Sequence, residues 1–219
     1  MDGHPGSTPD TVTVRWCTTD GDERRKAHAL LLRTAAELLR VPSSEIWLEH
    51  EPGGRPYLGG AGAGLSVSLA HARGTLAVAL TSKVPVGIDV EVVRALRAET
   101  LARTWLHPAE AEWVSALAEP ERAAAFLWLW TQKESVGKAL GQGLRRGGMS
   151  RRMPLAQQWP PDTVLVPRPL PGAEHLVSSA VLLGGGRYVL GLALQGGSPD
   201  GAVGDHPVQV RRVDLDAVT

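Results

Sequence analysis

The sequence has a single cysteine, Cys17, among its 219 residues, so it cannot form an intramolecular disulfide bond. It contains no C-x-x-C pair and no cluster of cysteine and histidine residues at the spacing of a zinc site. These absences exclude a disulfide-stabilised domain and the common structural zinc modules. They also favour a reducing, cytoplasmic location, because disulfide-rich proteins accumulate in oxidising compartments.

Long hydrophobic runs and an excess of one charge are missing as well. No stretch of about 18 consecutive apolar residues occurs, and residues 1–10 are polar and turn-rich, without an apolar signal core. The chain has 23 basic and 23 acidic residues, so its formal net charge is zero. We therefore expect no membrane span and no nucleic-acid partner bound through an overall positive field, while a local basic patch remains an alternative.

Several widespread site motifs are also absent. The chain has no G-x-x-x-x-G-K-[ST], which excludes a P-loop for phosphate binding, and it has no G-x-S-x-G. It also has no G-x-G-x-x-G after a predicted strand. Gly141, Gln142 and Gly143 form only a G-x-G, which is too short to indicate a site on its own.

The spacing of the apolar residues predicts a mixture of helices and strands. Residues 22–40 have helical periodicity, and a second long helix is predicted over 120–140, with Pro120 suited to its first turn. Residues 97–117 predict two shorter helical pieces that are separated before Pro108. Strands are predicted at residues 11–17, 45–51, 64–72, 74–82, 84–93, 162–166, 175–183 and 187–194.

A faint internal repeat suggests how these elements are organised. Residues 73–82 (RGTLAVALTS) are similar in pattern to residues 186–195 (GRYVLGLALQ), and each segment lies downstream of a predicted long helix. Shared α+β composition could also produce this similarity by chance. We predict an α+β fold built as a pseudo-dimer of two similar halves, each a long helix packed on a small antiparallel sheet. The predicted units are residues 11–85 and 86–195, with residues 1–10 and 196–219 flexible or peripheral.

Two acidic residues, Asp89 and Glu91, are separated by one position on the strand predicted over residues 84–93. Because side chains alternate along a strand, both carboxylates lie on the same face. Paired carboxylates repel each other unless a cation lies between them, and hard oxygen donors of this kind suit magnesium. The alternative, which is commoner for such a pair taken alone, is an edge strand with a solvated acidic face.

Glu134 and Lys138 are four residues apart on the predicted helix over residues 120–140, so they lie on the same side of it. The ordinary interpretation is a surface ion pair that contributes little to stability. The preceding segment AAAFLWLW is apolar on nearly all sides, which indicates a buried helix whose charged pair borders a cleft. Lys133 is adjacent to Glu134 and points in a different direction, so both lysines could flank a phosphate.

Four segments resemble Sfp-type 4′-phosphopantetheinyl transferases in sequence, order and spacing. They are GRPYL, SVSLAHARG, VGIDVE and WTQKESVGKALGQGL, which begin at residues 54, 66, 86 and 130. The combination of G-I-D-V-E with W-x-x-K-E-S-x-x-K-A-x-G is the most specific part of the resemblance. The resemblance implies two similar α+β halves with the active site at their interface, which agrees with the organisation predicted above.

The resemblance also implies a magnesium-dependent 4′-phosphopantetheinyl transferase. Such an enzyme moves the phosphopantetheine arm of coenzyme A to a serine of an apo acyl or peptidyl carrier protein and releases adenosine 3′,5′-bisphosphate. The single-chain form further implies a monomer that serves carrier proteins of polyketide or non-ribosomal peptide synthesis. Two alternatives stay open: a catalytically weak module that binds coenzyme A or a carrier protein, and a different magnesium-dependent phosphotransferase.

Four residues take the metal and catalytic roles that the resemblance implies. The metal ligands of the family fall on Asp89, Glu91 and Glu134. We expect Glu134 also to accept the serine proton, and Lys138 to stabilise the charge that develops in the transition state. Asp89 belongs to the catalytic set because the magnesium that it would hold neutralises the pyrophosphate.

The coenzyme A contacts implied by the resemblance fall on Arg55, His71, Lys133 and Lys138. Arg55 is the basic residue of the G-[KR]-P segment, and His71 is the histidine of the S-H segment. We expect Lys133 to orient a phosphate or a carboxylate. The chain departs from the family pattern at Ala70, where serine is usual, so one hydroxyl donor to the nucleotide is lost.

Overall fold

The computed structural model describes residues 11–82, 84–144, 148–196 and 208–214. These residues form helices, mainly antiparallel sheets and connecting loops, which confirms the predicted α+β class. None of the helices within them is long and apolar enough to cross a membrane. The predicted flexibility of residues 1–10, and of most of the C-terminal segment after residue 196, lies outside the described residues.

The first of two four-stranded sheets has the strand order β10-β1-β5-β4. Its strands are β1 (Val12–Thr18), β4 (Ser66–Ala72), β5 (Thr75–Thr81) and β10 (Val208–Arg212). Helix α1 (Glu23–Leu39) packs against one face. The sequence did not predict β10, which pairs in parallel with β1, whereas the other pairs are antiparallel. The C-terminal part of the chain therefore completes the N-terminal sheet.

The second four-stranded sheet has the strand order β6-β9-β8-β7, and all its neighbours are antiparallel. Its strands are β6 (Val86–Val92), β7 (Arg168–Leu170), β8 (Ala173–Leu183) and β9 (Tyr188–Gln195). The long helix α4 (Glu119–Ala139) packs on one face of this sheet. The shorter helices α2 (Ala98–Trp105) and α3 (Pro108–Ala116) precede it, and the predicted break before Pro108 is confirmed.

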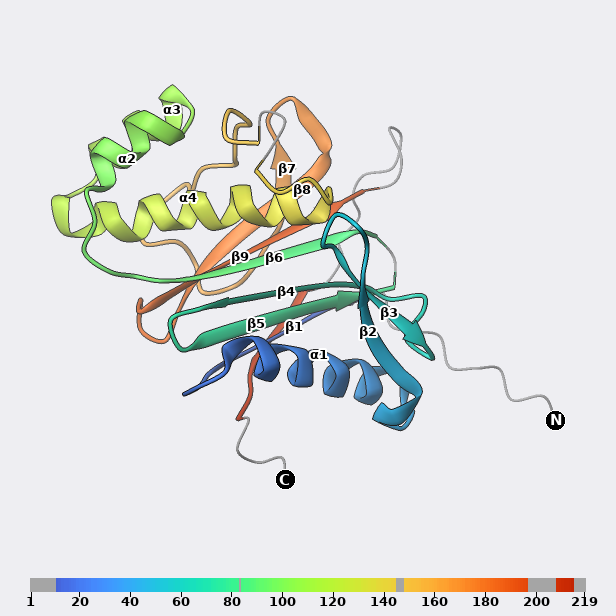
Figure 1. The fold of residues 1–219 in the computed structure, drawn as a ribbon. Coiled ribbons are helices and arrows are strands. Elements are labelled where there is room, and N and C mark those ends of the chain that lie inside the picture. Colours follow the sequence, from blue (N-terminus) through green and yellow to red (C-terminus); the bar gives the residue numbers. More distant parts are fainter. Residues whose placement is uncertain (1–10, 83, 145–147, 197–207, 215–219) are drawn as a thin grey trace.

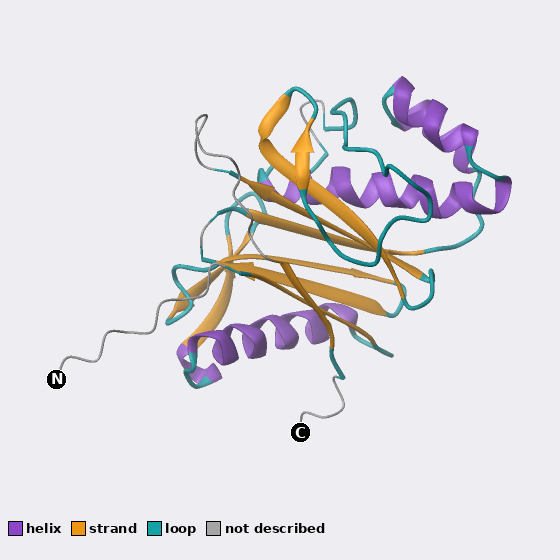
Figure 2. Ribbon diagram, turned by 180° about the vertical axis from the view of Figure 1, so that it is seen from behind, coloured by secondary structure: helices purple, strands orange, loops and turns teal. Residues whose placement is uncertain are grey.

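The two sheets lie face to face, with α1 and α4 on the opposite outer sides (Figure 1). The view from behind shows the same order of layers, with strands between helices (Figure 2). One apolar cluster fills the space between the sheets and includes Trp16, Ile88 and Leu190. Two further clusters lie under α1 and under α4, so each sheet buries both faces. A small separate sheet is formed by β2 (Ile46–His50), which follows a 3₁₀ turn at Ser43–Glu45, and β3 (Pro56–Gly60).

The strand predicted over residues 162–166 is wrong, because this segment is a loop. Its alternation is real, since Leu165 is only 4% exposed while Val164 and Val166 are 63% and 61% exposed. Pro167 directly follows the segment and has no backbone N–H with which to extend a hydrogen-bonded ladder. One buried leucine therefore anchors a loop that, read from sequence alone, resembles a strand.

The edge strands β4 and β6 of the two sheets are joined by side chains. The backbone N–H of Val86 donates to Ser66 Oγ at 3.0 Å, and the N–H of Ile88 donates to Ser68 Oγ at 3.1 Å. Hydroxyl groups of one sheet thus satisfy backbone donors at the edge of the other, where a continuous sheet would use carbonyl groups. The seam between the sheets is held together without a regular backbone ladder at these two positions.

A buried ion pair connects α4, α3 and the loop that follows α4. Lys133 Nζ lies 2.8 Å from Glu110 Oε2 and also donates to the carbonyl oxygens of Met149 and Arg151, at 3.0 and 2.6 Å. Glu110 in turn accepts the backbone N–H of Met153 at 2.7 Å. The two charged side chains are 0% and 2% exposed. Burial lowers the pKa of Lys133, and the neighbouring Glu110 carboxylate opposes this effect.

We predict that Lys133→Met lowers the free energy of unfolding by about 3–5 kcal/mol, because it leaves a buried carboxylate without its cation. Adding Glu110→Gln should recover part of this loss, since the amide is neutral and its oxygen still accepts the Met153 N–H. Urea unfolding followed by tryptophan fluorescence measures the free energy of unfolding of both variants.

The control for these variants is the exposed ion pair between Arg103 and Glu99, whose side chains are 70% and 38% exposed. Arg103→Met should cost less than about 1 kcal/mol. Equal losses for Lys133→Met and Arg103→Met would contradict the importance given to the buried pair.

Candidate active site

The ammonium group of Lys138 connects the end of α4 to the middle of β6. Lys138 Nζ donates to Asp89 Oδ1 at 2.8 Å and to the Ile88 carbonyl oxygen at 2.9 Å. A lysine ammonium has three hydrogens, and these two bonds are those that it makes within the described residues. The Lys138 side chain is 31% exposed, so its charge is accessible from the adjoining cavity.

Two glycines allow α4 to approach the sheet closely enough for this contact. A Cβ atom on Gly87 of β6 would lie 1.9 Å from the Ser135 carbonyl oxygen, and one on Gly191 of β9 would lie 2.5 Å from that of Thr131. The helix backbone therefore packs directly on the strand backbone at both positions. This close packing brings Lys138, in the last turn of the helix, within hydrogen-bonding distance of Asp89.

Glu134 lies one turn before Lys138 on the same helix and is partly buried. Burial raises its pKa, the negative charge of Asp89 raises it further, and Lys138 opposes the rise. Burial also raises the pKa of Asp89, again opposed by Lys138, and Glu91 adds to the rise. The three predicted carboxylates are thus close enough to influence one another electrostatically.

The donor chemistry of these carboxylates fits magnesium, which prefers hard oxygen ligands. A cation between them would relieve the mutual repulsion that raises the pKa values of Asp89 and Glu134. Among the described residues, however, no three such side chains are gathered closely enough to form a metal site. Lys138 neutralises Asp89 in this structure, and Arg94 lies 3.0 Å from Glu91.

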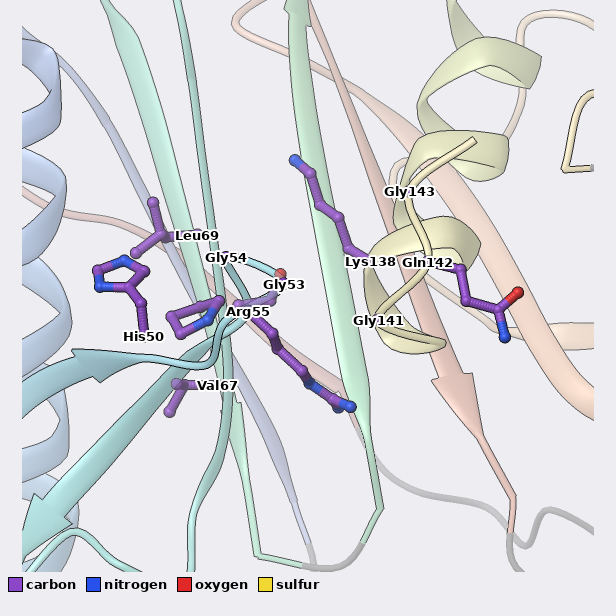
Figure 3. Close-up of a pocket in the computed structure, with 12 residues that line it drawn as sticks. His50, Gly53, Gly54, Arg55, Val67, Leu69, Lys138, Gly141, Gln142 and Gly143 are labelled. Atoms are coloured by element: carbon purple, nitrogen blue, oxygen red, sulfur yellow. The ribbon is translucent and has the colours of Figure 1, made fainter. Parts of the chain in front are cut away.

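A cavity of about 600 Å³ opens beside Lys138, at the seam between the two sheets. Three segments line it: residues 53–56 with His50, residues 67–69 of β4, and the end of α4 with the glycine-containing turn 141–143. Figure 3 shows Arg55 and Lys138 extending from opposite walls, while Gln142 points away from them. The structure therefore places two cationic side chains around one cavity, which suits an anionic ligand.

The turn after α4 depends on Gly141 and Gly143, whose φ angles are 65° and 58°. These left-handed conformations are easily adopted only by glycine, and they turn the chain back after the helix. The N–H groups of Gln142 and Gly143 both donate to the Gly137 carbonyl oxygen. The glycines thus end the helix, and Gly141 leaves the cavity wall without a side chain beside Arg55.

Two residues predicted to bind coenzyme A do not line this cavity. His71 is on β4 near the start of α1, where its Nδ1 atom lies 3.2 Å from Glu23 Oε2. Lys133 is enclosed by Glu110 and two carbonyl oxygens, which occupy all three of its hydrogen-bond donors. The structure therefore brings Arg55 and Lys138 to one cavity and places Lys133 elsewhere. The three carboxylates are not among the residues that line the cavity, and Asp89 is connected to it through its bond to Lys138.

His50 and His28 were not predicted from the sequence as residues near the site. His50 lines the cavity, and its ring centroid is 6.0 Å from that of His28 on α1. Burial lowers the pKa of His28, and the positive charge of Arg24 contributes to the same effect. Neither histidine belongs to a motif, because the folding of β2 against α1 is what brings them together.

Comparison with known proteins gives matches centred on this region. Residues 85–192 match the model of the 4′-phosphopantetheinyl transferase superfamily. The 4′-phosphopantetheinyl transferase HetI of Nostoc sp. is 31% identical over 111 residues, which cover 49% of this chain and 47% of HetI. The 4′-phosphopantetheinyl transferase Gsp of Aneurinibacillus migulanus is 26% identical over 132 residues, which cover 60% and 54% of the two chains. The chain thus matches about half the length of these curated relatives.

The region that matches the family model contains strand β6 and helix α4, the two elements joined by the contact between Asp89 and Lys138. Glu91 and Glu134 lie within the same region. The resemblance inferred from the sequence motifs is confirmed: residues 85–192 are similar to the 4′-phosphopantetheinyl transferase superfamily.

Proposed function

We propose that this chain transfers the 4′-phosphopantetheine arm of coenzyme A to a serine of an apo acyl or peptidyl carrier protein. The family implies this reaction class, in which adenosine 3′,5′-bisphosphate is released. The observation that carries the proposal is the contact between Asp89 and Lys138, whose lysine lines the cavity, inside the region matched to the family. A cation fixed beside a group of carboxylates is the arrangement that a phosphoryl transfer requires.

The cavity supports coenzyme A as the donor. Its volume of about 600 Å³ is within the usual range of small-molecule sites. Arg55 and Lys138 on its opposite walls supply positive charge for phosphate groups. We propose that Lys138 contacts the pyrophosphate and that Arg55 contacts another phosphate or the nucleotide. His71 stays a proposed coenzyme A contact outside the cavity lining, whereas Lys133 supports the fold.

In the proposed reaction the serine hydroxyl oxygen attacks the phosphorus that carries the pantetheine arm. The bond from that phosphorus to the bridging oxygen breaks, and adenosine 3′,5′-bisphosphate leaves with the electron pair. Lys138 stabilises the charge that develops on the phosphate oxygens. Glu134 accepts the serine proton, a role favoured by burial and by Asp89, which raise its pKa. Asp89, Glu91 and Glu134 would hold magnesium, which would supply charge neutralisation for the pyrophosphate.

We also propose that the two helix-and-sheet units are similar halves of a pseudo-dimer, with a boundary near Val86. Each four-stranded sheet carries one long helix, although the first sheet takes its fourth strand, β10, from the C-terminal part of the chain, and this arrangement supports the proposal. A single chain contains both units and the cavity between them, so we propose that it acts as a monomer. We also propose a cytoplasmic location. The carrier proteins of polyketide or non-ribosomal peptide synthesis are the proposed acceptors.

The proposed activity predicts a mass increase on a carrier protein. The wild-type chain, incubated with coenzyme A, magnesium and an apo acyl or peptidyl carrier protein, should add one phosphopantetheine group, measured by intact-protein mass spectrometry. A carrier variant with alanine in place of the acceptor serine is the control. If coenzyme A binds but no carrier in a panel gains mass, the chain is a binding module and the transferase proposal is wrong.

We predict that Lys138→Ala lowers kcat by ~10²-fold or more, since it removes a preorganised charge from the transition state. Arg187→Ala is the matched control. Arg187 is exposed in the turn between β8 and β9, and its substitution also removes one positive charge. Steady-state kinetics at varied coenzyme A concentrations measure kcat for both variants. An unchanged kcat in Lys138→Ala would show that this lysine has a structural role and no catalytic one.

Removal of divalent metal should abolish transfer, and added magnesium should restore it. Asp89→Ala should remain inactive at all magnesium concentrations, because it removes a proposed ligand and the partner of Lys138. Circular dichroism of the variant checks that the fold is intact. Full transfer by the wild type in excess chelator, or by Asp89→Ala without added metal, would disprove the proposed metal site.

A further inference from the structure

Ser68 lies at the point where the first sheet meets the predicted catalytic strand. Its side chain is on β4, is only 4% exposed and contributes to the lining of the cavity. Its hydroxyl oxygen accepts the N–H of Ile88 on β6 at 3.1 Å. The residue after Ile88 is Asp89, so this bond fixes the backbone directly beside the proposed catalytic carboxylate.

The backbone of Ile88 is held on the same edge by a second group. In an extended strand the N–H and C=O of one residue point to the same side. The Ile88 N–H binds Ser68 Oγ, and the Ile88 carbonyl oxygen accepts Lys138 Nζ at 2.9 Å. Lys138 also binds Asp89 Oδ1 at 2.8 Å. One peptide segment therefore connects the hydroxyl of Ser68 to both partners of the Lys138 ammonium.

We propose that Ser68 is a positioning residue that holds the Asp89–Lys138 pair in place from the opposite half of the fold. This inference rests on the proposed transferase function. Without the hydroxyl group, the Ile88 N–H loses its acceptor at the seam, and the edge of β6 is no longer fixed relative to β4. The Ile88 carbonyl and Asp89 then move relative to Lys138, because α4 is also held by its close packing on Gly191 of the neighbouring strand β9.

The structure supplies a matched control at Ser66. Its hydroxyl oxygen accepts the N–H of Val86 at 3.0 Å, so it forms the same kind of bond between the same two strands. Val86 lies two residues before Ile88, and the contacts of Lys138 are with Ile88 and Asp89. Ser66→Ala thus removes an equivalent seam bond without acting on the backbone that contacts Lys138.

The kinetic test compares Ser68→Ala, Ser66→Ala and Ser68→Thr in the full chain. We expect Ser68→Ala to lower kcat about tenfold with little change in KM for coenzyme A, since small displacements of catalytic groups reduce rates strongly. Ser66→Ala should retain the wild-type kcat, and Ser68→Thr, which keeps the hydroxyl, should recover most of it. Equal kcat values for the two alanine variants would overturn the proposal. If Ser68→Ala does not fold, Ser68→Cys takes its place, because a thiol is a weak acceptor.

A second measurement separates this inference from the proposed function. The ¹⁵Nζ and ammonium proton signals of Lys138, assigned with Lys138→Arg, report its surroundings whether or not the chain transfers phosphopantetheine. Ser68→Ala should shift these signals, and Ser66→Ala should leave them in place. A wild type that transfers nothing but shows this pattern would disprove the function and retain the positioning role. Signals that are unmoved by Ser68→Ala would disprove the positioning role alone.

Discussion

The contact of the Lys138 ammonium with Asp89 and the Ile88 carbonyl is the interaction on which the site depends. It joins the last turn of α4 to the middle of β6, and it places one positive charge among carboxylates whose pKa values burial raises. The contact requires the helix and the strand to approach without side chains between them. Gly87 and Gly191 make this approach sterically feasible, so backbone packing and site electrostatics are parts of one arrangement.

The cavity follows from how the two sheets meet. Their faces bury a common apolar cluster, but their edge strands β4 and β6 are bridged by serine hydroxyls at Ser66 and Ser68. A regular ladder there would bring the strands to about 4.8 Å along their whole length. The bridged seam instead leaves space beside Lys138, where Arg55 reaches in from the turn before β3. The ligand space is thus located between the two helix-and-sheet units.

Periodicity and local spacing were enough to predict the long helices and most strands, because these depend on nearby residues. The grouping of Asp89 with Glu134 and Lys138 followed from the family resemblance instead, since Asp89 and Lys138 are 49 positions apart in the sequence. The pairing of β10 with β1 could not be predicted, since it joins segments nearly two hundred positions apart. The same limit applies to Lys133, whose partner Glu110 is on another helix. The loop at 162–166 shows the opposite error: local alternation was present, but no strand pairs with it.

Lys133 and Lys138 show how one helix can give two neighbouring lysines different roles. Lys133 has no side-chain exposure, and three oxygens accept its three donors, so its charge is used entirely within the fold. Lys138 is partly exposed at the cavity and makes two bonds within the described part of the chain. Its third donor can therefore be directed at a ligand while the other two fix its position. A cation anchored in this way needs little reorganisation when charge develops beside it, which is the physical basis of electrostatic catalysis.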